Sequence, residues 1–242
     1  MAYIFFISAN IPLIDLTFAL SATSASSDLT FFLMRNAVTA IIDKYGIDRI
    51  HYSVIIFGST VIKRVTFDDQ FPEKNALNRI VGRSQKVVGE PNLLAALEEA
   101  KSLYELQSVR SNARKVLVVI LDAPSASNAT VVRQAVTDLD NKDVLVIGVG
   151  MGSSANENDL IGITKDDRHL INAPLNKSPR EVAQEIIEAI FYGINSTYLC
   201  FIIFLCFPLL FLSFVFYYLS WGKNVISIGI SDFFLSLFIK SY

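Results

Sequence analysis

Short apolar runs along the first part of the chain predict buried strands. The clearest is Lys115–Leu121, whose apolar part is unbroken and rich in β-branched residues, and which is followed by Asp122. Such a run is typical of a strand that is buried on both faces of a parallel sheet. The other segments that we interpret as strands are Ile14–Leu20, Ile50–Phe57, Val61–Phe67, Asp143–Val149 and His169–Ile171.

Between these runs, apolar residues at spacings of three and four predict amphipathic helices. The first helix has Ser26 or Ser27 as its N-cap and ends at Gly46. The last begins with the capping pattern Ser178-Pro-Arg-Glu181. The helices expected between these two run from Pro72 through Ile80, from Leu93 to Leu106, from Thr130 to Leu139 and from Glu157 to Ile163.

The alternation of strands and helices predicts an α/β fold. Strands that are separated by helices form a parallel, doubly wound sheet with helices on both faces. The segment Val61–Phe67 follows the strand Ile50–Phe57 after a short Gly-Ser turn, so we expect it to be one antiparallel edge strand.

Hydropathy divides the chain near residue 192. The hydrophobic content of 52% and the mean hydropathy of +0.44 are high for a globular domain, and the excess follows Phe191. We therefore expect an α/β domain over 13–192 and a hydrophobic tail over 193–242. The apolar segment 197–219 reaches the roughly 20 residues that cross a bilayer, which predicts a transmembrane helix and a membrane partner for the tail.

Both ends of the chain have a second interpretation. Residues 1–12 are a signal peptide or a truncated N-terminus, because the apolar run is short and lacks a positive n-region. The tail is a membrane anchor or translated non-coding sequence joined by a wrong gene model. With an anchor, we expect a membrane protein with an extracellular domain; without one, a secreted protein. Sequencing the transcript across the codons for 192–195 distinguishes the two.

Charge and cysteine content exclude several classes of site. A net charge of −2 without a basic cluster gives no reason to expect a nucleic-acid partner. Cys200 and Cys206 both lie in the tail, so the domain has neither a disulfide nor a thiolate metal site. His51 and His169 are too few and too isolated for a histidine-based zinc site.

The order of these motifs resembles the von Willebrand factor type A domain, also called the integrin I-type domain. The resemblance covers residues 14–192. It rests on Ile14–Leu20 with the Ser/Thr-rich loop after it, Tyr52–Gly58, Leu93–Leu97, Lys115–Asp122 and Val144–Gly150. It implies an adhesion module that binds a protein through the loops at the carboxyl ends of the strands.

Many members of that family hold Mg²⁺ or Mn²⁺ in these loops, and the ligand protein adds its own carboxylate. The family's Asp-x-Ser-x-Ser pattern maps onto Ser21, Thr23 and Ala25, its threonine onto Pro91, and its second aspartate onto Asp122. Only Asp122 matches, and Thr23 is a tolerable replacement. Because Mg²⁺ requires oxygen ligands, we expect a degenerate site with no cofactor and no residual Mg²⁺ binding. Asp122 then accepts hydrogen bonds from loop groups such as the hydroxyl of Thr23.

We therefore expect a non-catalytic protein-binding module of the extracellular-matrix or cell-surface type. Its partner is a protein, such as a matrix protein, which contacts the loops 21–27, 89–92 and 122–128. The predicted contact residues are Thr23, Ser24, Asn92, Asp122 and Ser125. Asn128 and Asn176 begin Asn-x-Ser/Thr sequons and are candidate glycosylation sites.

Two other functions stay open at this point. The segment Gly148-Val-Gly-Met-Gly152 follows a strand, and glycines near a helix can cradle phosphate, so one alternative is a nucleotide-dependent α/β enzyme. The motif is late in the chain and incomplete, so we interpret its glycines as serving a turn. No nucleophile–base pair emerges from the pattern. The other alternative is a structural spacer domain without a ligand.

Overall fold

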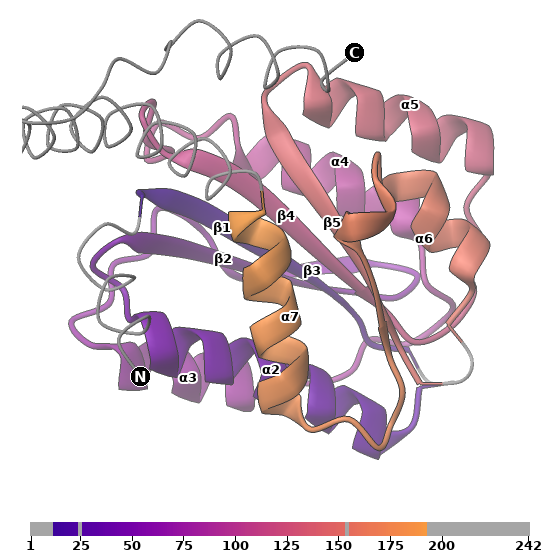
Figure 1. Ribbon diagram of the computed structural model, residues 1–242, viewed down its shortest axis with the longest axis horizontal. Helices are drawn as coiled ribbons and strands as arrows, with labels where there is room; N and C mark the ends of the chain where they lie inside the picture. The colour runs from indigo at the N-terminus through magenta and orange to yellow at the C-terminus, as the bar shows by residue number, and fades with distance from the viewer. Residues whose placement is uncertain (1–11, 24–25, 153–154, 193–242) are drawn as a thin grey trace, which may run out of the picture. The chain divides into compact units, whose positions relative to one another are not determined.

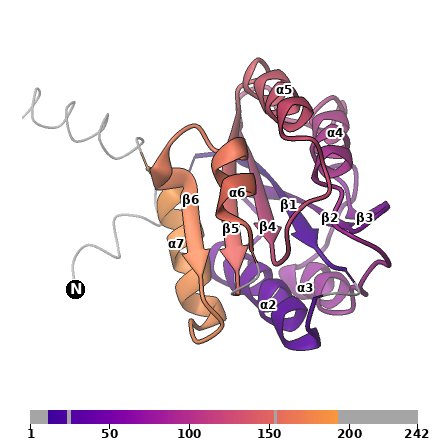
Figure 2. The ribbon, with the colours of Figure 1, turned by 90° about the vertical axis from the view of Figure 1, so that its right-hand side faces the viewer.

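A sheet of six strands organises the residues that the computed structural model describes, which are 12–23, 26–152 and 155–192. Figure 1 shows the sheet with its helices. The strand order is β3-β2-β1-β4-β5-β6, which can be followed in Figure 2. All neighbouring pairs are parallel except β2 and β3, which confirms the predicted α/β fold with one antiparallel edge strand. The strands are β1 (Ile14–Ser21), β2 (Ile50–Phe57), β3 (Val61–Val65), β4 (Arg114–Leu121), β5 (Val144–Met151) and β6 (Leu170–Ala173).

Helices cover both faces of this sheet (Figure 2). The core on one face contains residues of α2, α3 and α7, and the core on the other face contains residues of α4, α5 and α6. The helices are α2 (Asp28–Tyr45), α3 (Lys74–Gly82), α4 (Leu93–Leu103), α5 (Ala129–Asp140), α6 (Glu157–Ile163) and α7 (Pro179–Phe191), with a 3₁₀ turn η1 (Asp167–His169).

The two cores explain the unbroken apolar run in β4. Successive side chains of a strand point to opposite faces of the sheet. Val116, Val118 and Ile120 lie in the first core, and Leu117 and Val119 in the second. All five are fully buried, so a polar residue at any of them would lie in an apolar layer.

Several predicted element boundaries were wrong by a few residues, among them the ends of β5 and β6, which lie at Met151 and Ala173. Helix α3 begins at Lys74 rather than Pro72, because Ala76 N first bonds to the Glu73 carbonyl. Helix α4 ends at Leu103 rather than Leu106, where the chain leaves the helix. Strand β3 ends at Val65 rather than Phe67, because Asp69 accepts hydrogen bonds from Thr66 and forms a turn.

None of the helices in 12–23, 26–152 and 155–192 is long and apolar enough to span a membrane. The span predicted over 197–219 belongs to a tail that lies outside the described residues, as do residues 1–11. Ser24 and Ala25, two of the predicted site positions, also lie outside them.

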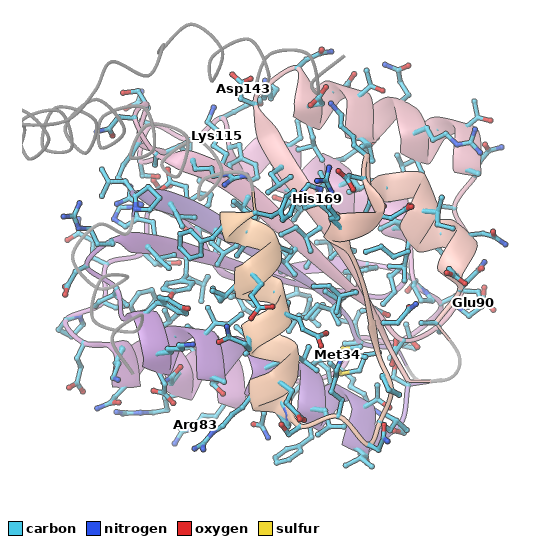
Figure 3. The ribbon with its side chains drawn as sticks, in the orientation of Figure 1. Met34, Arg83, Glu90, Lys115, Asp143 and His169 are labelled. Carbon is cyan, nitrogen blue, oxygen red and sulfur yellow. The ribbon has the colours of Figure 1, made fainter. Side chains whose placement is uncertain are left out.

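A buried ion pair closes the amino end of the sheet, where Figure 3 labels Lys115 and Asp143. Asp15 in β1 is fully buried and accepts hydrogen bonds of 2.8 Å from both the backbone N and the Nε of Arg110. His51 Nδ1 lies 3.9 Å from Asp15 Oδ1. Burial, followed by the nearby Arg110 charge, lowers the pKa of His51 below its ordinary value, although Asp15 acts in the opposite direction.

Candidate functional site at the sheet top

The carboxyl ends of β1, β4 and β5 and the loops that follow them form one end of the domain, which we call the sheet top. Open α/β sheets place ligand sites at this end. The loop between α3 and α4, residues 83–92, also reaches it, and Figure 3 shows Glu90 of that loop far from Lys115 and Asp143. The sheet top therefore contains most of the site positions predicted from the sequence.

Ser21 and Asp122 meet at the centre of the sheet top. Strands β1 and β4 are parallel neighbours, so the residues at their carboxyl ends lie side by side. Ser21 Oγ donates a hydrogen bond of 2.8 Å to Asp122 Oδ1, and Asp122 is only 6% exposed. Within the described residues, Asp122 Oδ2 has no hydrogen-bond partner. Asp122 is thus bonded to Ser21, and the prediction that Thr23 supplies this bond was wrong.

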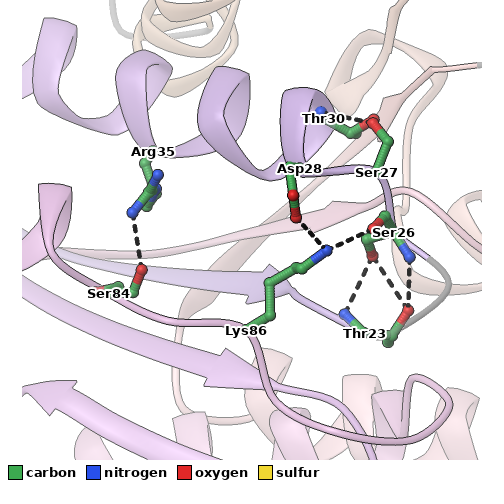
Figure 4. A network of polar contacts seen from close by, with 8 residues as sticks. All are labelled: Thr23, Ser26, Ser27, Asp28, Thr30, Arg35, Ser84 and Lys86. Carbon is green, nitrogen blue, oxygen red and sulfur yellow. Dashed lines mark hydrogen bonds and ion pairs between the residues drawn. The ribbon is translucent and has the colours of Figure 1, made fainter.

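Thr23 is bonded within its own loop instead (Figure 4). Its backbone N donates to Ser26 Oγ at 3.1 Å, and its hydroxyl lies 3.1 Å from the same atom. Ser26 N donates back to Thr23 Oγ1 at 3.3 Å. The next residue, Ser27, caps α2 through a 2.9 Å bond from Thr30 N. These bonds hold the loop to the start of the helix and take Thr23 away from Asp122.

Lys86 joins the α3–α4 loop to the start of α2 (Figure 4). Its Nζ donates to the Ser26 carbonyl at 2.8 Å and lies 2.6 Å from Asp28 Oδ1. The hydrogen bond from Lys86 is the main reason that the pKa of Asp28 is lowered. This role could not be predicted from the sequence, because a single lysine in a loop has no periodicity and its contact is long-range.

The segment after Lys86 crosses the ends of β1 and β2. Val87 N donates to the Ala22 carbonyl at 2.7 Å, and Ser59 N donates to the Val88 carbonyl at 3.3 Å. Val87 is buried whereas Val88 is 79% exposed, so Val88 presents an apolar side chain to solvent at the sheet top. Gly89 has a φ of +96°, and a Cβ there would lie 2.5 Å from Ser59 Oγ, so this crossing requires glycine.

The β4–α5 loop supplies caps for the N-terminus of α4. The first backbone N–H groups of a helix have no partner within it. Ser125 Oγ accepts from Leu93 N at 3.3 Å, and Ser127 Oγ accepts from Leu94 N at 3.1 Å. Asn92 Oδ1 accepts from Ala95 N at 3.1 Å. Two of the predicted contact residues, Asn92 and Ser125, therefore hold the loops in place.

The same loop is fastened to two further segments. Ser125 Oγ donates to the Pro91 carbonyl at 3.1 Å, and Ala126 N donates to that oxygen at 3.2 Å. Ser125 N donates to Asp159 Oδ2 in α6 at 2.8 Å. Sequence reasoning missed Ser127 and Asp159. Their hydroxyl and carboxylate belong to ordinary loop and helix sequences, and only the fold brings them together.

The oxygen atoms at the sheet top do not fit a Mg²⁺ shell, which requires near-octahedral oxygen ligands. The Ser21 hydroxyl donates a hydrogen bond to Asp122, and the Thr23 hydroxyl is hydrogen-bonded to Ser26. Pro91 has no side-chain oxygen, and its carbonyl already accepts two hydrogen bonds. Within the described residues, no group of three or more His, Cys, Asp or Glu side chains has a geometry suited to a metal ion. Asp122 Oδ2 is the oxygen of this set that has no partner.

The glycines of the Gly148–Gly152 motif have a packing role. Gly148 lies within β5, as the strand predicted over 143–149 implies, and Gly150 also lies within β5 and not in the turn that we expected. Of the three glycines only Gly152, which follows the strand, has a positive φ, of +89°. A Cβ on Gly150 would lie 2.8 Å from Leu160 Cδ1, and one on Gly148 would lie 3.3 Å from Leu160 Cδ2. The missing side chains thus let α6 pack closely on β5.

The predicted glycosylation sites are both on the surface. Asn128 and Asn176 have exposed side chains. Asn128 also caps α5, because its Oδ1 accepts a 2.9 Å hydrogen bond from Thr130 N. Its amide nitrogen is the atom that would carry a glycan.

Comparison with known proteins identifies relatives of this domain. The family model for the von Willebrand factor type A domain matches residues 15–187. Proximal thread matrix protein 1 from the mussel byssus is similar, with a TM-score of 0.62 and 18% identity over 73% of this chain. The match spans 45% of that protein, less than half of its length. Another structure of the same protein has a zinc-occupied metal-ion-dependent adhesion site, with a TM-score of 0.61 and 18% identity over 74% of this chain and 45% of that one.

A second similar structure is that of manganese-loaded TRAP protein from Plasmodium vivax. It has a TM-score of 0.60 and 16% identity, over 72% of this chain and 73% of that one. At these identities the likeness demonstrates a shared fold and nothing finer. The metals belong to those proteins.

Proposed function

The chain belongs to the von Willebrand factor type A domain family, and on this premise we propose that it binds a protein partner through the sheet top without a bridging metal ion. Domains of this family are generally adhesion and protein-interaction modules, and they are typically non-catalytic. The observation that carries the proposal is the hydrogen bond from Ser21 to Asp122, which stands where the family holds its cation.

Metal-free binding is supported by the chemistry of the site. A serine in place of an aspartate removes one negative charge, and a hard divalent cation needs such charge to offset the loss of its water. The Ser21 hydroxyl also satisfies Asp122 Oδ1 directly. Thr23 and Pro91 direct their oxygens to other groups of the protein. The partner must then be held by direct contacts.

The sheet top is suited to direct contacts because hydrogen bonds join the described residues of its loops. Binding is weakened by the entropy lost when loops become fixed, and a pre-organised surface avoids that cost. The bonds of Lys86, Ser125 and Ser127 tie three separate connections together. Val88 adds an exposed apolar side chain. These features favour a binding module over a spacer domain without a ligand.

We also propose that the domain is extracellular, either held at a membrane by its tail or secreted, with a matrix protein as partner. The exposed sequons at Asn128 and Asn176 support this location. If the domain enters the secretory pathway, glycosidase treatment will increase its electrophoretic mobility, and Asn128→Gln with Asn176→Gln will abolish that change. An unchanged mobility of the wild-type protein would contradict the location.

Site-specific crosslinking tests the binding proposal. A photo-reactive benzoylphenylalanine is placed at Val88 at the sheet top or, as the control, at Ile62 on the edge strand β3, which is also exposed. We expect one protein to crosslink from position 88 and not from position 62, with equal yield in EDTA. Crosslinking from both positions would overturn the sheet top as the binding surface. Loss of the product in EDTA would overturn metal-free binding.

A further inference from the structure

One carboxylate oxygen of Asp122, at the centre of the sheet top, has no hydrogen-bond donor within the described residues. The residue is 6% exposed, and its Oδ2 has no hydrogen-bond partner within the described part of the chain. A buried carboxylate oxygen that lacks a donor is costly, so most such atoms are paired. In a typical member of the family a cation fills this need. Here the oxygen set does not fit a divalent ion.

Three further carboxylates belong to the segments that reach the sheet top. Glu90 precedes Pro91, and Glu157 and Asp159 lie in the first turn of α6. Asp159 is fixed beside the β4–α5 loop by its bond from Ser125 N. Within the described residues, none of the three forms an ion pair with a lysine or arginine. All of them are therefore uncompensated by a neighbouring cation.

The cations near the sheet top do not balance these charges. Lys86 is bonded to Asp28, which neutralises it. Lys177, which follows β6, pairs with Glu185 of α7. Arg83 lies far from Glu90 in the view of Figure 3. Arg35 donates to the carbonyls of Gly82 and Ser84 at the start of the 83–92 loop. With Arg35 and Arg83 counted, the four carboxylates Asp122, Glu90, Glu157 and Asp159 still leave an excess of negative charge at the described part of the sheet top, where Val88 is exposed and the unpaired Asp122 oxygen is buried.

The charge of the sheet top determines which side chains of a partner protein are attracted to it. In many family members the ligand protein contributes an acidic side chain that binds the metal ion. At this sheet top an acidic side chain of the partner would meet like charges without a cation between them, which opposes association. Lysine and arginine carry only donors and a positive charge. Their aliphatic stems also pack against exposed apolar side chains such as Val88 while the charged head reaches polar groups.

We propose that the protein partner presents a lysine or arginine to the sheet top, the reverse of the acidic contact made through a metal. This proposal rests on the proposed function, because it assigns the chemistry of the partner at the same surface. It concerns a protein side chain and assigns no role to free polyamines or nucleic acid.

Selection from a random peptide library tests this charge preference. The immobilised full chain, in EDTA, selects peptides from a phage-displayed library, and the photo-reactive residue at Val88 or Ile62 shows where each peptide binds. We expect peptides that crosslink from position 88 to be enriched in lysine and arginine. Acidic or uncharged peptides that crosslink there would overturn the charge preference alone. Selected peptides that crosslink only from position 62, or the absence of any selected peptide, would overturn the proposed function as well.

Charge variants then test the residues. For a selected basic peptide, Glu90→Gln together with Glu157→Gln should raise the Kd about fivefold, because each exposed pair contributes modestly. Adding salt should reduce this difference by screening. The matched control is Glu73→Gln, an exposed glutamate that precedes α3, and it should leave the Kd unchanged. An equal effect of the control and the paired variant, or no effect of the pair, would overturn the proposal. Free spermidine that competes as strongly as the peptide would overturn the assignment to a protein side chain.

Discussion

Ser21 Oγ donates a hydrogen bond of 2.8 Å to Asp122 Oδ1 across 101 positions of the sequence. The bond joins the carboxyl ends of two neighbouring parallel strands at the point where the family places a divalent cation. It partly satisfies a buried carboxylate.

Removing the Ser21 hydroxyl should destabilise the domain. In Ser21→Ala both oxygens of the buried Asp122 lack a donor within the described residues, so we expect the free energy of unfolding to fall by about 2 kcal/mol. Urea denaturation measures it. The control is Ser102→Ala, which loses only an exposed 3.1 Å hydrogen bond to the carbonyl of Glu98 within helix α4. It should change the value by less than about 0.5 kcal/mol.

Replacing Ser21 by aspartate should create a metal requirement. Ser21→Asp places a second carboxylate beside Asp122, and the two charges repel each other, so the melting temperature should fall in EDTA. Mg²⁺ or Mn²⁺ should restore it, because two carboxylates supply the charge that the cation needs. The wild-type protein is the control and should not respond. A Mg²⁺-dependent rise in its melting temperature would contradict metal-free binding.

Ser125 should stabilise the start of α4 from outside the helix. Ser125→Ala removes the acceptor for Leu93 N and the donor to the Pro91 carbonyl. Loss of a helix cap of this kind should lower the free energy of unfolding by about 1 kcal/mol. Hydrogen exchange at the Leu93 amide should become faster. Ser125→Thr keeps the hydroxyl and should behave like the wild type, and an equal loss in that variant would show that the hydroxyl is not the cause.

Gly150 should be intolerant of any side chain. In Gly150→Ala the new Cβ would lie 2.8 Å from Leu160 Cδ1 and 3.2 Å from Ala155 Cβ, which forces α6 away from β5. Overpacking of this kind should cost about 2 kcal/mol in thermal or urea unfolding. Gly162→Ala in α6 is the matched control, because nothing lies within 4 Å of its new Cβ. It should stabilise the helix by about 0.5 kcal/mol.

Acidification should destabilise the fold through His51. Burial and the Arg110 charge lower the pKa of His51 in the folded protein below the ordinary value of 6.5. The unfolded chain binds the proton more readily than the folded protein does. The contribution of His51 to the free energy of unfolding is therefore constant above pH 6.5 and falls as the pH decreases from 6.5 through the lower pKa of the folded protein.

His51→Gln should reduce this slope in urea denaturation at a series of pH values. The pKa of His169 is also lowered, mainly by burial, so His169→Gln is the comparison that separates the two contributions. An unchanged slope in His51→Gln would show that protonation of His51 does not cause the loss of stability in acid.

Much of the fold was predictable because its signals are local. The run in β4 indicated a strand buried on both faces, and the cores on each side confirm it. The capping pattern before α7 is present as predicted: Ser178 N donates to Glu181 Oε2 at 2.7 Å, and Glu181 N donates to Ser178 Oγ at 3.3 Å. Both patterns depend on residues a few positions apart.

The glycine motif shows where a local pattern misleads. Gly148 and Gly150 have the spacing of a phosphate-binding loop or a turn, and the structure places them inside β5. The reason for glycine is the approach of Leu160, a residue of a helix that packs across the strand. A clash between two elements cannot be read from the composition of either one.

The sequence by itself determined the order of strands and helices, the parallel sheet and the family. These features follow from residue type, periodicity and the order of motifs along the chain. That Ser21 stands where a family ligand is an aspartate is implied by the resemblance and stays a prediction. Only the tertiary structure decided what the sheet-top residues do. It pairs Ser21 with Asp122, turns Thr23 toward Ser26, brings Lys86 to Asp28, and makes Ser125 a cap for a distant helix. Side chains bond to whichever donor or acceptor the fold places within about 3 Å, and that neighbour is set by packing and not by sequence spacing.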